Sequence, residues 1–154
     1  MSEAVTLVSA SPEETRRLGK RLGEQLRVGD VVLLSGELGA GKTVFVQGIA
    51  QGVGFKGSVS SKSYVLLGEY AGLVKLYHAD LYRLESPQEV EELALDEISE
   101  DGVLVVEWPD RAGDNVLPED HVRIDFEVSG EDTRVLRISG EGERAVELIA
   151  RVKD

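Results

Sequence analysis

Residues 36–43 read Gly36-Glu37-Leu38-Gly39-Ala40-Gly41-Lys42-Thr43, which matches the phosphate-binding loop pattern G-x-x-x-x-G-K-[ST]. Small residues let successive backbone N–H groups curl around a phosphate, while Lys42 supplies a positive charge and Thr43 a hydroxyl for Mg²⁺. The apolar run 31–34 is typical of a buried strand, and residues 44–53 carry apolar side chains at helical spacing. A helix that begins at such a loop points its positive end at a bound anion. The stretch therefore predicts a site for a nucleoside triphosphate.

The bulk properties are those of a globular protein with one domain. The chain has 154 residues, of which 42% are hydrophobic and 30% charged, so we expect residues 1–154 to form a single unit. It contains no cysteine, which excludes disulfides and thiolate metal sites. The N-terminus lacks the features of a signal peptide, and no apolar run approaches the length of a membrane span. We therefore expect a cytoplasmic protein that has no membrane partner.

The charge of the chain argues against direct binding of nucleic acid. The formal net charge is -12, whereas proteins that grip nucleic acid usually have a basic face. Four basic residues cluster on the first predicted helix: Arg16, Arg17, Lys20 and Arg21. We favour a solvated helix face for them over an RNA contact. If the protein serves a nucleic-acid pathway, the more favoured route is through a protein partner.

Pattern and capping signals predict an α/β domain. Capping boxes at Ser11-Pro12-Glu13-Glu14 and Ser86-Pro87-Gln88-Glu89 each open a helix, the first running to about Arg27 and the second turning Val90, Leu93 and Ile98 inward. We expect strands over 5–8, 31–34, 65–70, 73–82, 103–106, 122–128 and 134–139, and a last helix over 143–152. Since the short links make hairpins, we expect a P-loop-like domain with a mixed parallel and antiparallel sheet flanked by helices.

An acidic residue follows one of the buried strands. A phosphate-binding loop needs a carboxylate that holds Mg²⁺ from a neighbouring strand. Glu107 comes directly after the apolar run 103–106, and beside a phosphate-binding loop we favour a magnesium role for it over an ordinary surface position. Trp108, the only tryptophan, follows at once. Core packing and a platform for a nucleotide base are both open for Trp108.

The segment His78-Ala79-Asp80-Leu81-Tyr82-Arg83 places polar groups at the end of another strand. In an extended chain His78, Asp80 and Tyr82 share one face. Asp80 could bind a metal through water or orient an attacking water. His78 could position a phosphate, but a core histidine with its hydrogen bonds satisfied is the favoured interpretation.

The motifs GELGAGKT at 36–43, HADLYR at 78–83 and VEWPDR at 106–111 together resemble the bacterial TsaE (YjeE) family. The resemblance covers nearly the whole chain, including the stretch S-x-E-E-T-x-x-L-G at 11–19. It implies a P-loop fold that binds ATP with Mg²⁺ and belongs to tRNA threonylcarbamoyladenosine biosynthesis. It also implies partner proteins of the TsaD and TsaB type, which modify adenosine 37 of tRNA, and ATP hydrolysis that resets this transferase complex.

The resemblance assigns roles to individual residues. Asp80, Lys42 and Glu107 would be catalytic, Asp80 as the essential acid in hydrolysis. Thr43, Glu107 and Asp80 would be close to the metal. The nucleotide would contact the following residues: Leu38, Gly39, Ala40, Gly41, Lys42 and Thr43 of the loop, Trp108, and Ser11 at the border of the adenine.

One segment departs from the family pattern. Similar proteins carry S-P-T-[FY] where this chain has Ser61-Lys62-Ser63-Tyr64. Lys62 lacks the fixed φ that proline would impose. We expect residues 57–64 to form a nucleotide-dependent switch that is looser than in relatives with the proline.

Two other functions are compatible with a phosphate-binding loop. A small-molecule kinase needs a lid with several arginines, but between Ser60 and Asp110 the only arginine is Arg83, which argues against a kinase. A nucleotide-gated binding module with negligible turnover stays open, because binding and hydrolysis use nearly the same residues. No arginine lies close after the loop to act as an internal finger, so we expect slow hydrolysis by the isolated chain.

Overall fold

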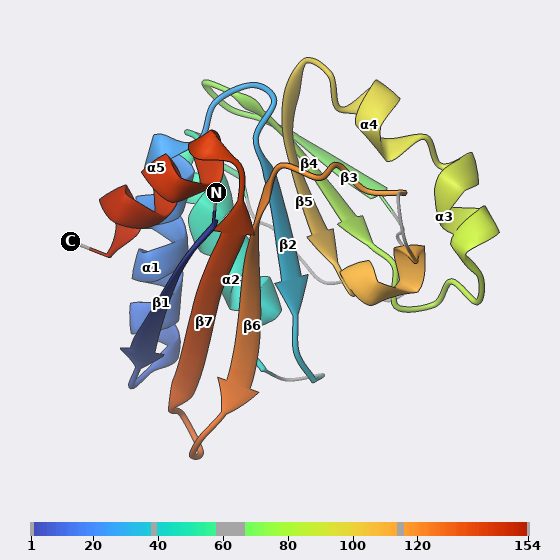
Figure 1. Ribbon diagram of the computed structural model, residues 1–154. Coiled ribbons are helices and arrows are strands. Elements are labelled where there is room, and N and C mark those ends of the chain that lie inside the picture. The colour runs from blue at the N-terminus through green and yellow to red at the C-terminus, as the bar shows by residue number, and fades with distance from the viewer. Residues whose placement is uncertain (1, 38–39, 58–66, 114–115, 154) are drawn as a thin grey trace.

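The computed structural model describes residues 2–37, 40–57, 67–113 and 116–153 (Figure 1). Leu38 and Gly39 of the phosphate-binding loop lie outside the described residues. So does the predicted switch, apart from Gly57. Within the described residues the chain forms one seven-stranded sheet with the strand order β1-β7-β6-β2-β5-β4-β3.

The strands are β1 (Ser2–Ser9), β2 (Val31–Ser35), β3 (Leu67–Ala71), β4 (Lys75–Asp80), β5 (Gly102–Glu107), β6 (His121–Val128) and β7 (Arg134–Glu141). The helices are α1 (Pro12–Gln25), α2 (Lys42–Gly52), α3 (Pro87–Glu92), α4 (Leu95–Ile98) and α5 (Glu143–Val152), with the 3₁₀ helix η1 (Pro109–Ala112). In the part of the chain described, no helix combines the length and apolarity needed to cross a bilayer.

The sheet is mixed, as the hairpins predicted. Strands β6, β2, β5 and β4 are mutually parallel, whereas β7 pairs antiparallel with β6 and β1, and β3 pairs antiparallel with β4. Helices α1, α2 and α5 cover one face, while α3, α4 and η1 cover the other face over β4 and β5 (Figure 1). Both faces of β5 are thus covered, which is why 103–106 is apolar throughout.

Helices α1 and α2 pack backbone against backbone. A Cβ on Gly19 would lie 2.3 Å from the carbonyl oxygen of Phe45, and one on Gly23 would lie 2.4 Å from that of Ile49. Only a hydrogen fits at either position. The contacts advance by four residues on both helices, so the two helices run parallel. The N-terminus of α1 therefore lies at the same end of the domain as the phosphate-binding loop.

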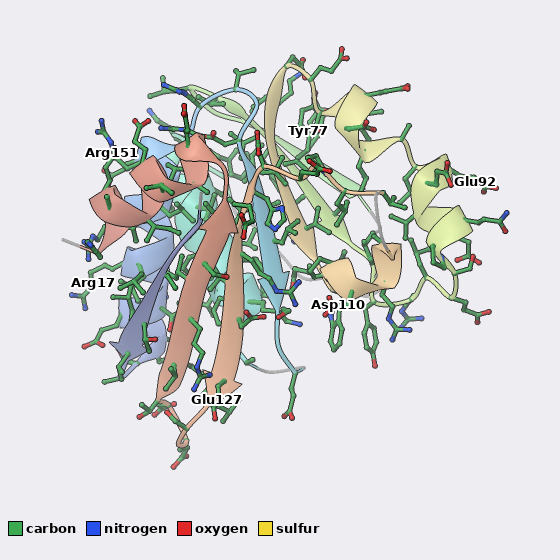
Figure 2. All side chains as sticks on the ribbon, viewed as in Figure 1. Arg17, Tyr77, Glu92, Asp110, Glu127 and Arg151 are labelled. Atoms are coloured by element: carbon green, nitrogen blue, oxygen red, sulfur yellow. The ribbon has the colours of Figure 1, made fainter. Side chains whose placement is uncertain are left out.

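Two arginines attach α5 to the rest of the helical layer. Arg144 forms a bidentate pair with the buried Asp30, with Nε–Oδ1 and Nη2–Oδ2 distances of 2.9 Å. Arg21 of the basic cluster donates to the carbonyl oxygen of Val152 at 2.5 Å. Arg17 of the same cluster points to solvent from α1 (Figure 2). The basic cluster is therefore divided between a structural contact and an exposed helix face.

The helix predicted after Ser86 is interrupted. The Ser86 cap forms as expected, since its hydroxyl accepts from the Glu89 N–H at 3.4 Å. Ala94 then adopts a left-handed conformation, with φ of 50°, and separates α3 from α4. This change of direction turns Leu95 inward and leaves Ile98 38% exposed, so the prediction of a buried Ile98 is wrong.

We expect Gly48→Ala to lower the free energy of unfolding by about 1–3 kcal/mol. Its new methyl carbon would lie 2.1 Å from the carbonyl oxygen of Arg16, so α1 would have to move away. Alanine is the better helix former by about 1 kcal/mol, and that gain opposes the effect. Urea denaturation measures the difference, with Gly130→Ala as the control because its nearest neighbours would be 3.4 Å away. Equal or greater stability of Gly48→Ala would contradict the close packing.

Candidate active site

Three parallel strands bring the predicted site residues to one edge of the sheet. In the register of the sheet Leu34 of β2 pairs with Glu107 of β5, and Asp80 of β4 pairs with the same residue from the other side. Ligands of open α/β sheets bind beyond the carboxyl ends of such strands. Glu107 therefore lies between the strand that leads into the phosphate-binding loop and Asp80.

Glycine conformations shape the described part of the loop. Gly36 has φ of +144° and Gly41 has φ of +99°, both of which are unfavourable for residues with a Cβ. At Gly36 a Cβ would also lie 2.9 Å from the carbonyl oxygen of Phe126. Gly41 is the N-cap of α2, and Thr43 lies half-buried in the first helical turn. A helix N-terminus framed by glycines fits an anion such as phosphate.

Lys42 is a buried cation at the centre of the site. Its side chain is nearly inaccessible, with 4% of the residue exposed. The ammonium donates to the carbonyl oxygen of Gly36 at 2.6 Å and lies 3.9 Å from the ring centroid of Trp108. Burial lowers the pKa of Lys42, while the negative charges of Glu107 and Asp80 act in the opposite direction. A buried charge of this kind is costly unless it is paired and hydrogen-bonded, and here the Gly36 carbonyl oxygen and the nearby carboxylates are its partners.

Two carboxylates face this cation. Glu107 is 4% exposed, and its Oε2 lies 2.6 Å from His78 Nε2, so the half-buried His78 has its hydrogen-bonding partner in Glu107. Burial raises the pKa of Asp80, and the charge of Glu107 adds to this, while a hydrogen bond from the Tyr82 N–H opposes it. The two strand-end acids are therefore electrostatically coupled to each other and to Lys42.

The donor set fits magnesium bound together with a phosphate. Among the residues that the structure describes, no group of three or more His, Cys, Asp or Glu side chains could hold a metal ion. Mg²⁺ in nucleotide sites commonly uses one or two carboxylates plus substrate phosphates and water. The Glu107 and Asp80 carboxylates, with the Thr43 hydroxyl on α2, match that requirement.

Trp108 combines an unusual backbone conformation with a position beside the Lys42 ammonium. It has φ of 60° and ψ of 49°, a left-handed conformation that is uncommon for a bulky residue. Its N–H donates to the carbonyl oxygen of Leu34 at 3.1 Å, and its ring lies 4.9 Å from that of Tyr82. The indole also packs partly against the core on the α3 side of the sheet. Trp108 therefore contributes to the core and also covers the Lys42 ammonium.

The N-terminus of α1 borders the loop, together with a residue that the sequence did not indicate. The Ser11 hydroxyl accepts from the Glu14 N–H at 3.2 Å and caps the helix. A Cβ placed on Gly41 would lie 3.8 Å from Cγ2 of Thr15 and 4.0 Å from Cγ of Arg134. Thr15 belongs to the family-like stretch 11–19, whereas Arg134 lies in a hairpin with no local signal. Its Nη1 donates to hairpin carbonyl groups, namely those of Gly130, Glu131 and Thr133.

A family model described as "Threonylcarbamoyl adenosine biosynthesis protein TsaE" matches residues 9–136. This chain belongs to the TsaE family. It is 38% identical over 138 residues to TsaE of Bacillus subtilis (strain 168), covering 88% of this chain and 85% of that one. It is 41% identical over 137 residues to TsaE of Streptomyces coelicolor, covering 84% and 92% of the two chains. The crystal structure of Bacillus subtilis YdiB superposes with a TM-score of 0.82 and 31% identity over 99% of this chain and 96% of that chain. The resemblance to TsaE and the P-loop NTPase-like α/β fold are thereby confirmed.

We expect Asp80→Asn to stabilise the fold near neutral pH. The folded state raises the pKa of Asp80 above its ordinary 3.8, so the native chain holds this proton more tightly than the unfolded chain. Stability is therefore lost as pH rises from the unfolded pKa through the folded pKa, and the penalty is complete above both values. Asparagine removes the charge, and its amide oxygen still accepts from Tyr82.

Urea denaturation at about pH 7 and at about pH 3 tests this expectation. At the lower pH the Asp80 carboxyl group is largely protonated in both the folded and the unfolded chain. Asp80→Asn should be more stable than the unmodified protein at the higher pH and equal to it at the lower pH. Asp132→Asn on the exposed hairpin is the control. If Asp80→Asn is less stable than the unmodified protein at neutral pH, the charge of the Asp80 carboxylate favours folding and the expectation is wrong.

Proposed function

We propose that this chain is a Mg²⁺-dependent ATPase that acts as an accessory subunit in tRNA N6-threonylcarbamoyladenosine biosynthesis. The observation that carries the ATPase part is the buried Lys42 ammonium, which faces the strand-end carboxylates of Glu107 and Asp80 at a helix N-terminus. Membership in the TsaE family supports the pathway, since the relatives are tRNA threonylcarbamoyladenosine biosynthesis proteins.

In this proposal a phosphate of the nucleotide replaces the present hydrogen-bonding partner of Lys42. The ammonium now donates to the Gly36 carbonyl oxygen, and a β or γ phosphate would accept from it instead. The N–H groups from Leu38 to Thr43 would hold the phosphates. The adenosine would lie towards the N-terminus of α1, because Ser11 caps that helix and Thr15 borders Gly41.

Hydrolysis needs neutralisation of phosphate charge and a positioned water. Bound Mg²⁺ would supply the neutralising charge, held through Thr43 and Glu107. His78 holds the Glu107 carboxylate in place by the 2.6 Å contact. Asp80, whose pKa is raised by burial, would accept a hydrogen bond from the attacking water and orient it.

The proposed partners are proteins of the TsaD and TsaB type, and hydrolysis would reset their complex between turnovers. A net charge of -12 is consistent with contact to tRNA through these proteins rather than by this chain. Arg134 lies beside the loop, but its Nη1 donates to carbonyl groups of the hairpin. A cation that stabilises the phosphate charge during hydrolysis could therefore come from a partner protein. Groups supplied in trans can raise turnover by about 10³-fold or more.

Phosphate release, measured with and without the transferase proteins, tests the function. We expect a slow rate for the isolated chain and a marked increase when the partners are added. A kinase would instead transfer phosphate to a small acceptor, and a binding module would release none under either condition. A fast rate that partners leave unchanged would contradict the accessory role.

We expect Lys42→Ala to weaken ATP binding about tenfold to a hundredfold, through loss of a charge-assisted contact worth about 1.5–3 kcal/mol. Titration calorimetry gives the affinity, and circular dichroism confirms that the variant is folded. Lys153→Ala, at an exposed position after α5, is the matched control. An unchanged affinity in folded Lys42→Ala would exclude the phosphate role.

We expect Glu107→Ala and Asp80→Ala to separate binding from turnover. Both carboxylates act with Mg²⁺ and water, so affinity for Mg²⁺-free nucleotide should change little while hydrolysis falls. Calorimetry with and without Mg²⁺, combined with phosphate release, measures the two effects. Glu107→Ala with the rate and Mg²⁺ dependence of the unmodified protein would refute its metal role.

A further inference from the structure

The turn that follows β5 carries two residues of the proposed site and is conformationally costly. Glu107 ends the strand, Trp108 adopts the left-handed conformation, and η1 begins at Pro109. Such a backbone persists at a bulky residue only where its surroundings hold it. One attachment is the hydrogen bond from the Trp108 N–H to the carbonyl oxygen of Leu34.

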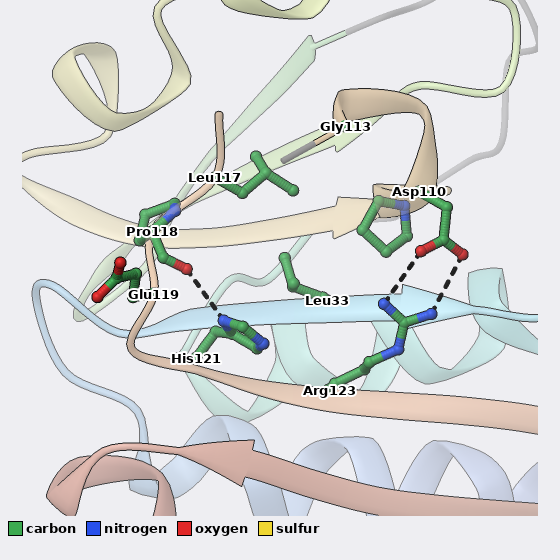
Figure 3. A pocket seen from close by; sticks show the side chains of 9 residues that line it. Leu33, Asp110, Gly113, Leu117, Pro118, Glu119, His121 and Arg123 are labelled. Carbon is green, nitrogen blue, oxygen red and sulfur yellow. Dashed lines mark hydrogen bonds and ion pairs between the residues drawn. The ribbon is translucent and has the colours of Figure 1, made fainter. Parts of the chain in front are cut away.

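A second attachment runs through side chains of β6, which lies on the other side of β2. Arg123 donates from Nη1 and Nη2 to the two oxygens of Asp110 at 3.3 and 3.2 Å (Figure 3). The same guanidinium donates from Nε to Asp125 at 3.1 Å. Asp125 in turn accepts from the hydroxyl of Ser35, the residue before Gly36. The chain of contacts therefore connects the turn after β5 to the start of the phosphate-binding loop.

Open space beside the turn increases the importance of this pair. A cavity of about 320 Å³ is bordered by Leu33, Pro109 and Leu117 and by both members of the Asp110–Arg123 pair (Figure 3). Pro109 is itself buried, but the Asp110 side of the turn has this open space beside it. A planar guanidinium that binds a carboxylate with two donors also fixes its orientation, which a lysine ammonium does not.

We propose that Arg123 is a positioning residue, which holds the Trp108–Asp110 turn through Asp110 and thereby orients Trp108 over Lys42 and Glu107 beside it. The connection to Mg²⁺·ATP rests on the function proposed above, whereas the effect on the turn does not. Asp110 is 78% exposed, and exposed ion pairs contribute little to global stability. Loss of the pair should therefore alter the turn while the fold stays intact.

The test uses Arg123→Gln, Arg123→Lys and Asp110→Asn in the full chain. The control is Arg137→Gln, which breaks an ion pair of 2.6 Å with Glu127 on the same face of the sheet. Glu127 lies towards the hairpin end of β6, away from the turn (Figure 2). Acrylamide quenching of the single tryptophan, without nucleotide, reports on the turn. Phosphate release at increasing Mg²⁺ reports on the site.

We expect greater quenching of Trp108 in Arg123→Gln and Asp110→Asn than in Arg137→Gln, with unchanged thermal midpoints. The half-saturating Mg²⁺ concentration should rise about threefold to tenfold, and kcat should fall with little change in Mg²⁺-free ATP affinity. Arg123→Lys should lie between these variants and the unmodified protein. The double variant Arg123→Gln/Asp110→Asn should be no worse than Arg123→Gln alone, because Arg123→Gln already removes the contact that Asp110→Asn removes.

Equal quenching in Arg123→Gln, Asp110→Asn and Arg137→Gln would overturn the positioning role. If the unmodified protein hydrolyses no ATP but the difference in quenching is present, Arg123 positions the turn and the proposed ATPase function fails. If hydrolysis is present and the quenching is equal, the ATPase function stands and the role of Arg123 is refuted.

Discussion

The contact between α1 and α2 is the constraint on which the geometry of the site depends. The two helices approach so closely that backbone carbonyl groups of one lie where side chains of the other would be, at Gly19 and Gly23 among others. This contact fixes both the distance and the parallel direction of the helices. Because of it, the capped N-terminus of α1 and the N-terminus of α2 meet at the phosphate-binding loop. Larger residues would separate the helices and remove Thr15 from Gly41.

The site concentrates features that oppose stability. Lys42 and Glu107 are charged groups with 4% exposure each, burial raises the pKa of Asp80, and Trp108 has a left-handed backbone. Local conflicts of this kind are typical of functional sites, where the surrounding fold compensates for them. Here the compensation comes from four parallel strands whose buried apolar runs hold the loop, the carboxylates and the turn at one edge.

The half of the sheet without a predicted site residue also contributes to the site. Strand β6 pairs in parallel with β2 and carries Arg123 and Asp125, which connect to the turn after β5 and to Ser35. Strand β7 begins with Arg134, which lies beside Gly41. Helix α5 is attached through Arg144 to Asp30, directly before β2. The C-terminal third of the chain therefore contacts both ends of β2, the strand that leads into the loop, and also borders Gly41 of the loop itself.

Local patterns were sufficient to predict most of the elements and the principal site residues. The loop pattern, two capping boxes, the hairpins and the buried strands predicted a mixed α/β sheet, and the family resemblance has been confirmed. Glu107 and Asp80 were each predicted as acids at the end of a strand, and the family resemblance placed both near the metal. Their meeting at one edge follows from the parallel register of β4 and β5. Their proposed roles with Mg²⁺ and water stay predictions.

Contacts between distant parts of the chain could not be predicted in this way. Periodicity and capping report on neighbours within a few residues, whereas the pairing of His78 with Glu107, the cover of Trp108 on Lys42 and the reach of Arg134 depend on register and helix packing. The break at Ala94 depends likewise on how α3 and α4 fit against the sheet, and the acidic sequence continued a helical pattern through it. Residue types and strand ends follow from short-range chemistry; which side chains meet depends on the packing of the complete sheet and its helices.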